Sequence, residues 1–144
     1  DFYDSDRVIE ERTGADIPWI FDMEGESGFR DRETAVLQEL AAEQGAVVAT
    51  GGGIVVRPAN AEIMKSSGVV VYLTASIDQL VERTARDKKR PLLQVDNPRQ
   101  KIIELLAVRE PLYREVADVV VNTDKRSPKS VAQEIASLVG RDSR

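Results

Sequence analysis

Two aspartates stand at alternate positions near the start of the chain, as Asp4 and Asp6 in the stretch FYDSD. They follow two aromatic residues, and we expect them at the end of a short strand. There, one carboxylate could join the water shell of a magnesium ion while the other binds a substrate hydroxyl. Alternatively, Asp6 is an ordinary N-cap residue of the helix that follows. These residues alone leave both interpretations open.

Three consecutive glycines, Gly51, Gly52 and Gly53, directly follow the apolar run AVVAT. Glycine permits positive φ and lets another group approach the backbone closely. One glycine would indicate only a tight turn. Three in succession, just past the carboxyl end of a buried strand, favour a ligand held against backbone N–H groups, because open α/β sheets bind ligands at that edge.

Three arginines have ordinary structural interpretations when each is considered alone. Arg30 could lie on the solvated face of a helix, and Arg126 could belong to a surface turn before the last helix. Arg109 could form an ion pair with Glu110 or Glu115. Each could also bind an anionic ligand, since guanidinium groups bind carboxylates and phosphates in planar, bidentate geometry.

Arg90 ends the basic run RDKKR and precedes Pro91. A residue before proline is biased away from helical geometry, which favours a loop here. Such a charge run is usually solvated, but a loop arginine can also close over phosphates.

Composition narrows the possible chemistry. The chain has 144 residues, a formal net charge of -5 and neither cysteine nor histidine. Disulfides and thiolate metal sites are therefore excluded, and a reducing cytoplasm is the expected location. Acid–base chemistry near neutrality would fall to carboxylates or lysines. The acidic balance argues against a nucleic-acid partner, and no apolar run has membrane-spanning length.

Strand-like and helix-like patterns alternate along the chain, which predicts an α/β fold with a parallel sheet covered on both faces. The expected strands are 2–3, 46–50, 68–73 and 117–123. Two short helices around Gly25 and Gly28 should be followed by a helix that begins near Phe29 and ends at Gly45. The remaining expected helices cover 8–12, 59–66, 77–87, 98–108 and 128–139.

In their joint order and spacing, these features resemble the shikimate kinase family. The matching stretches are FYDSD, GFRDRE, ATGGG, RDKKRPLL, REPLY and TDKRSP, and they extend over essentially all 144 residues. The resemblance implies a P-loop kinase fold of the nucleoside monophosphate kinase type, with three α/β/α layers and a parallel five-stranded sheet. It implies one domain over 1–144, with a substrate-binding subdomain at about 5–35 and a lid at about 86–96.

The resemblance also implies an activity. The γ-phosphoryl group of ATP would be transferred to the 3-hydroxyl of shikimate, a step toward chorismate and the aromatic amino acids. The implied partners are shikimate, ATP and Mg²⁺, and the full-length domain is expected to be a monomer.

Site roles follow from the resemblance position by position. Asp4 would hold magnesium through water, and Asp6 would bind the substrate hydroxyls and accept a proton. The shikimate carboxylate would be bound by Arg30 and Arg109, while the glycine turn presents its backbone to the substrate. On the ATP side, Arg90 would be the lid arginine that meets the phosphates. The residues implied to flank the adenine are Arg83, Arg126 and Pro128.

One motif of the family does not occur in the sequence: the phosphate loop G-x-x-x-x-G-K-[ST]. We therefore expect a truncated chain that lacks the first strand and helix and turns over ATP poorly. Unpaired strand edges, exposed apolar surface and partial unfolding or association are expected with it. A preparation confirmed to begin at Asp1 that shows normal turnover would contradict this expectation.

Two alternatives stay open on the sequence. One is a related P-loop kinase for another small hydroxy acid, of the gluconate type. The other is a non-catalytic remnant that binds shikimate or a protein partner. The paired Arg30 and Arg109 beside the glycine turn favour shikimate over the first, and the retained Arg90 and Arg126 argue against the second.

Overall fold

Strands and helices alternate through a computed structural model that describes residues 1–86 and 97–141. The elements in chain order are β1 (Phe2–Asp4), α1 (Ser5–Thr13), α2 (Ile17–Ala41), β2 (Val47–Ala49), the 3₁₀ helix η1 (Gly52–Val56), α3 (Pro58–Ser67), β3 (Val71–Thr74), α4 (Ile77–Arg86), α5 (Pro98–Val116), β4 (Val119–Asn122) and α6 (Pro128–Arg141). The expected lid, apart from Arg86, lies outside the described residues.

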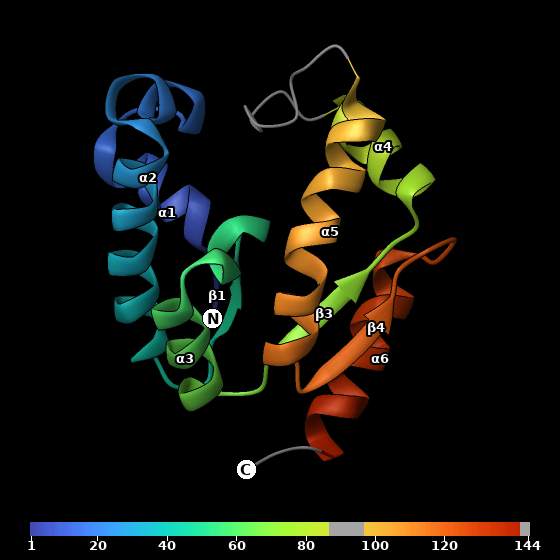
Figure 1. Ribbon diagram of the computed structural model, residues 1–144. Helices are drawn as coiled ribbons and strands as arrows, with labels where there is room; N and C mark the ends of the chain where they lie inside the picture. The colour runs from blue at the N-terminus through green and yellow to red at the C-terminus, as the bar shows by residue number, and fades with distance from the viewer. Residues whose placement is uncertain (87–96, 142–144) are drawn as a thin grey trace.

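The strands form two separate parallel pairs. In the first pair β1 lies beside β2, with Asp4 opposite Ala49. In the second pair β3 lies beside β4, with Thr74 opposite Asn122. Figure 1 shows α1, α2 and α3 around the first pair and α4, α5 and α6 around the second. Both pairs are parallel, so the two strands of a pair have their carboxyl ends on the same side. The segments that follow the two strands therefore begin next to each other.

Two buried apolar clusters hold the first half together and join it to α5. The first contains residues of α1 and α2: Ile9, Ile17, Ile20, Phe29, Val36 and Leu40. The second brings Leu37 of α2 against Ile54 and Val55 of η1 and Val116 of α5. Helix α2 reaches both clusters because its apolar residues recur at intervals of three and four.

An apolar cavity of about 1000 Å³ lies between the two strand pairs. Its walls include Val48 of β2, Val71 of β3, Ile102 of α5 and Ile135 of α6. Within residues 1–86 and 97–141, every strand has a strand neighbour on one side only. Val47 and Leu73 on these strands are 65% and 51% exposed. The expected unpaired edges and exposed apolar side chains are thus present.

Two of the expected helix boundaries are wrong. The expected break at Gly25 is present, because Gly25 has non-helical angles (φ 74°, ψ 175°), but the expected break at Gly28 is not, and α2 continues to Ala41. Helix α5 does not end at Val108 but continues through Pro111 to Val116. Proline removes one backbone hydrogen bond from a helix interior. Packing of Val116 in the second cluster offsets that loss.

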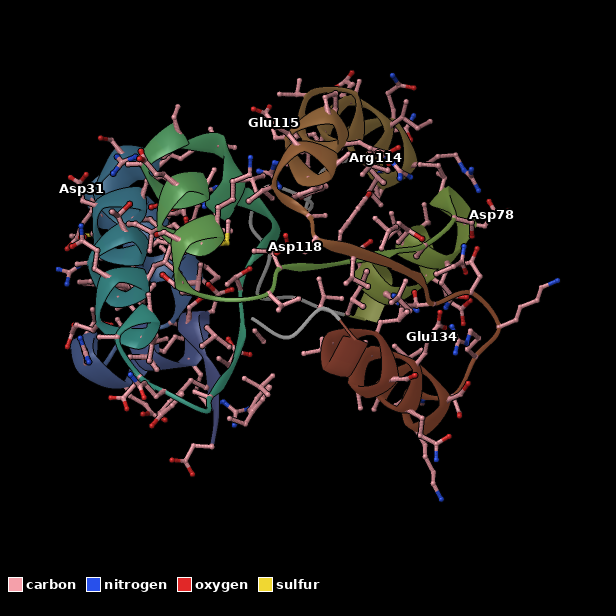
Figure 2. All side chains as sticks on the ribbon, turned by 90° about the horizontal axis from the view of Figure 1, so that it is seen from below. Asp31, Asp78, Arg114, Glu115, Asp118 and Glu134 are labelled. Atoms are coloured by element: carbon pink, nitrogen blue, oxygen red, sulfur yellow. The ribbon has the colours of Figure 1, made fainter. Side chains whose placement is uncertain are left out.

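Charged side chains lie mainly on the outside of the two halves. Figure 2 places Asp31 on the outer face of α2, and Asp78 and Glu134 on the outer side of the other half. In the same view Asp118 lies between the halves, where its Oδ2 accepts a hydrogen bond of 2.8 Å from the backbone N–H of Val70. None of the helices described has the length and apolar character needed to cross a membrane.

Candidate active site

The two aspartates at the end of β1 have different environments. Asp4 is the N-cap of α1, and its Oδ1 accepts hydrogen bonds from the N–H groups of Asp6 (3.0 Å) and Arg7 (3.4 Å). The interpretation of Asp6 as the cap is therefore wrong. Asp6 lies in the first turn of α1, where its carboxylate faces the glycine turn: a Cβ placed on Gly51 would be 3.1 Å from Asp6 Oδ2.

The glycine turn owes its composition to close contacts rather than to backbone angles. Gly51 has φ -70°, and the positive-φ glycines of the described chain are at other positions. A Cβ on Gly53 would lie 2.2 Å from Arg30 Nη2, and a Cβ on Gly52 would lie 2.8 Å from Tyr113 Oη. A side chain at either position would displace a polar group of the site.

Arg30 is a buried side chain, so its interpretation as part of a solvated helix face is wrong. It is 7% exposed, and its Nη1 donates to Glu33 Oε1 at 2.9 Å. Its Nε lies 3.5 Å from the half-exposed Glu26, and its guanidinium lies over the Phe29 ring. Burial raises the pKa of Glu33, and the charge and hydrogen bond of Arg30 oppose the shift. The hydrogen bond between Arg30 and Glu33 holds the Arg30 guanidinium against Gly53.

Arg109 reaches the same turn from α5. Its Nη1 would lie 3.7 Å from a Cβ on Gly52. Arg109 and Asp6 are also close enough to Glu33 to affect its pKa, Arg109 lowering it and Asp6 raising it. Glu110 accepts a hydrogen bond from Tyr72 and forms an ion pair with Arg114. Arg30, Arg109 and Asp6 therefore surround one turn, an arrangement suited to a small ligand with a carboxylate and hydroxyl groups.

The residues expected on the ATP side gather at the carboxyl ends of β3 and β4. Arg83 Nη2 donates to Thr123 Oγ1 at 3.1 Å, and that hydroxyl donates to the Thr74 carbonyl. Arg126 donates to the Asn122 carbonyl at 3.0 Å and forms an ion pair with Glu134. Arg126 is therefore a partly buried member of a polar network rather than a freely solvated turn residue.

Pro128 begins α6, two residues after Arg126. The cavity between the strand pairs is lined by Gly52 and Arg109 of one group and by Arg83 of the other. One continuous cavity therefore reaches both the glycine turn with Arg109 and the residues at the ends of β3 and β4. Arg90 lies outside the described residues.

The acidic residues of the described chain do not form a complete metal site, since residues 1–86 and 97–141 hold no group of three potential ligands. A magnesium ion bound to nucleotide phosphates needs only one or two carboxylates and keeps several water molecules. Asp4 fits that lesser requirement, because both of its cap hydrogen bonds are accepted by Oδ1.

Two polar residues of the site were not selected from the sequence. Glu33 could have been found from its spacing, since residues three apart on a helix are neighbours and Arg30 precedes it by three. Tyr113 lies four residues after Arg109, but its contact with the glycine turn spans 61 positions. No pattern in the residues near Tyr113 predicts that contact.

Comparison with known proteins decides the family. The shikimate kinase family model matches residues 1–139. The chain belongs to the shikimate kinase family. It is 59% identical over 134 residues to the shikimate kinase of Pseudomonas aeruginosa strain LESB58, covering 93% of this chain and 78% of the relative. It is 56% identical to that of Thioalkalivibrio sulfidiphilus strain HL-EbGR7, covering 94% and 71%.

Solved shikimate kinases share the fold. The Acinetobacter baumannii shikimate kinase in complex with shikimate superposes with a TM-score of 0.96 at 50% identity, covering 99% of this chain and 80% of that one. The Aquifex aeolicus enzyme gives 0.82 at 34%, covering 99% and 83%. The predicted α/β P-loop kinase fold is thereby confirmed. As a shikimate kinase the chain is a transferase that uses ATP as co-substrate, and the gluconate-type alternative is not the family found.

Proposed function

We propose that the turn between Arg30, Arg109 and Asp6 binds shikimate and presents its 3-hydroxyl to ATP. The observation that carries this proposal is the buried Arg30–Glu33 pair, held against Gly53 beside Arg109. The Acinetobacter baumannii relative, whose structure is a complex with shikimate, supports it.

Arg30 and Arg109 would bind the shikimate carboxylate from two sides. A guanidinium offers paired N–H donors in a plane, which matches the two oxygens of a carboxylate. Glu33 accepts from Arg30 Nη1 and so fixes the orientation of that guanidinium before the ligand arrives. A guanidinium that is already oriented loses less conformational entropy when the substrate binds.

Asp6 would face the substrate hydroxyls across the turn from the arginines. In the transfer, the 3-hydroxyl oxygen bonds to the γ-phosphorus of ATP while the bond to the leaving ADP oxygen breaks, and Asp6 takes the hydroxyl proton. Phosphoryl transfer asks for positioning and charge stabilisation more than for covalent help. A chain without histidine can therefore support it.

The nucleotide would lie toward β3 and β4, with its adenine between Arg83, Arg126 and Pro128. Arg90 would meet the phosphates from the lid. Asp4 would hold Mg²⁺ through water, and bound magnesium would neutralise charge on the β- and γ-phosphates. A full-length domain that is monomeric and lies in the cytoplasm, where ATP and thiol-reducing conditions prevail, completes the proposal.

Arg109→Ala tests the shikimate site. We expect the affinity for shikimate to fall by about 2 to 5 kcal/mol, because one partner of a buried charge pair is lost, while the affinity for ATP stays close to that of the unsubstituted chain. Titration calorimetry with each ligand measures both affinities. Arg114→Ala, on the same helix and paired with Glu110, is the matched control. Equal shikimate affinity in the Arg109 variant and the unsubstituted chain would contradict the proposal.

A further inference from the structure

The hydroxyl of Tyr113 donates a hydrogen bond to the glycine turn. Its Oη donates to the carbonyl oxygen of Gly52 at 2.7 Å. The side chain comes from α5, while Gly52 begins η1, so the bond joins two elements that bear different parts of the site. None of the roles derived above uses this residue.

The position of the Tyr113 hydroxyl is fixed by packing. The ring lies against Tyr72 of β3, with centroids 4.9 Å apart and planes inclined by 36°. It also packs on the second buried cluster. The Tyr72 hydroxyl donates to Glu110 on α5, away from the turn. Arg114 lies over the Tyr72 ring, and Figure 2 shows it on α5. Tyr113 is therefore a preorganised donor.

The bond sets the orientation of the Gly52–Gly53 peptide. The described chain has no cis peptide bond, so the C=O of Gly52 and the N–H of Gly53 point in opposite directions. With the C=O directed at Tyr113, the Gly53 N–H is directed away from Tyr113. A run of glycines has little intrinsic preference for one peptide orientation. The Tyr113 hydroxyl supplies a preference that the backbone lacks.

The same bond restrains the part of α5 that carries Arg109. Residues four apart on a helix lie on the same face, so Arg109 and Tyr113 both face the turn. Pro111 stands between them and cannot donate the backbone hydrogen bond of its position. The hydrogen bond from Tyr113 to Gly52, one helical turn beyond Arg109, therefore stabilises a helix segment that lacks one backbone hydrogen bond.

We propose that Tyr113 is a positioning residue for shikimate. Through one hydrogen bond it sets which backbone groups the glycine turn offers and how far Arg109 stands from that turn. The inference rests on the proposed shikimate site and adds to it a specific residue that does not itself contact the substrate.

Tyr113→Phe tests the inference, because it removes the hydroxyl and keeps the ring. Tyr72→Phe is the matched control, since it removes the hydroxyl of the ring next to it, which bonds Glu110 instead. We expect calorimetric titration to show shikimate affinity about 3- to 10-fold weaker in Tyr113→Phe, as for loss of one hydrogen bond. We expect Tyr72→Phe to stay within about twofold of the unsubstituted chain, and the ATP affinity of both variants to be unchanged.

Amide spectra of the unliganded proteins give a second measurement that does not depend on binding. The Gly52 and Gly53 resonances should move in Tyr113→Phe and stay in place in Tyr72→Phe, while Gly14 and Gly45 stay in place in both. The inference is overturned if Tyr113→Phe binds shikimate as the unsubstituted chain does, or if both variants weaken binding equally. If the unsubstituted chain binds no shikimate, the proposed function fails and this inference fails with it.

Discussion

Glu33 is a buried carboxyl whose ionisation is linked to the stability of the fold. It is 1% exposed, and burial raises its pKa above the ordinary value of 4.5. An acid with a raised native pKa holds its proton more tightly in the folded state than in the unfolded state. Its contribution to stability is therefore complete below the ordinary pKa and is lost as pH rises through the raised value.

Glu33→Gln should remove this pH dependence. We expect the free energy of unfolding of the unsubstituted chain, minus that of the variant, to decrease as pH rises from 4.5 through the raised pKa, and then to level off. Urea unfolding at a series of pH values measures the difference, and the other carboxyls cancel because both chains contain them. A difference that grows with pH would show that the ion pair with Arg30, rather than burial, dominates.

Gly53 is the position at which a side chain would most directly displace the carboxylate-binding group. A Cβ there would lie 2.2 Å from Arg30 Nη2, so Gly53→Ala should push the guanidinium out of place. We expect shikimate affinity to fall by about tenfold or more, as for loss of a charged hydrogen bond. Gly68→Ala is the control, because nothing lies within 4 Å of its Cβ and its φ of 171° suits any residue. Unchanged affinity in Gly53→Ala would place the carboxylate elsewhere.

At the scale of elements, the kink in α2 depends on one glycine. Gly25 has φ 74° and ψ 175°, a combination nearly restricted to glycine. Arg32 binds Glu24 across the kink through two hydrogen bonds of 2.7 Å. The kink separates the first turns of α2, which carry Ile17 and Ile20, from the part that carries Arg30 and Glu33.

Gly25→Ala should lower the free energy of unfolding by about 1 to 3 kcal/mol, because the backbone must hold an alanine in a disfavoured region. Gly140→Ala, inside α6 with no atom near its Cβ, should be neutral or stabilising by up to about 1 kcal/mol. Chemical unfolding of both variants measures the contrast. Equal stability of Gly25→Ala and the unsubstituted chain would mean that α2 straightens without cost.

At the scale of the whole molecule, the two strand pairs present apolar edges. We expect the chain to associate as its concentration rises, because exposed strand edges pair readily with other chains. Sedimentation velocity over a concentration series measures this. Leu73→Lys, on β3, should weaken the association, whereas Val108→Lys, at a 66% exposed apolar position on α5, should not. A monomer at every concentration would contradict the expectation.

Much of the fold was predictable because its signals are local. Valine-rich runs predicted β2, β3 and β4, and apolar spacing predicted most helices, since each pattern reflects contacts within a few residues. The predicted break at Gly25 was confirmed, whereas the predicted break at Gly28 was wrong, because only Gly25 leaves helical angles. The early end at Val108 was wrong because packing at Val116 outweighs the lost hydrogen bond at Pro111.

The sequence by itself determined the α/β class, the order of the elements and the family, because these depend on residue types at characteristic spacings. Only the tertiary structure decided that Arg30 is buried, that Glu33 holds it and that Tyr113 bonds Gly52. Asp4, rather than Asp6, also proved to be the cap of α1. The physical reason is distance along the chain: Tyr113 and Gly52 meet across 61 positions, through packing of α5 on η1 that no local pattern encodes.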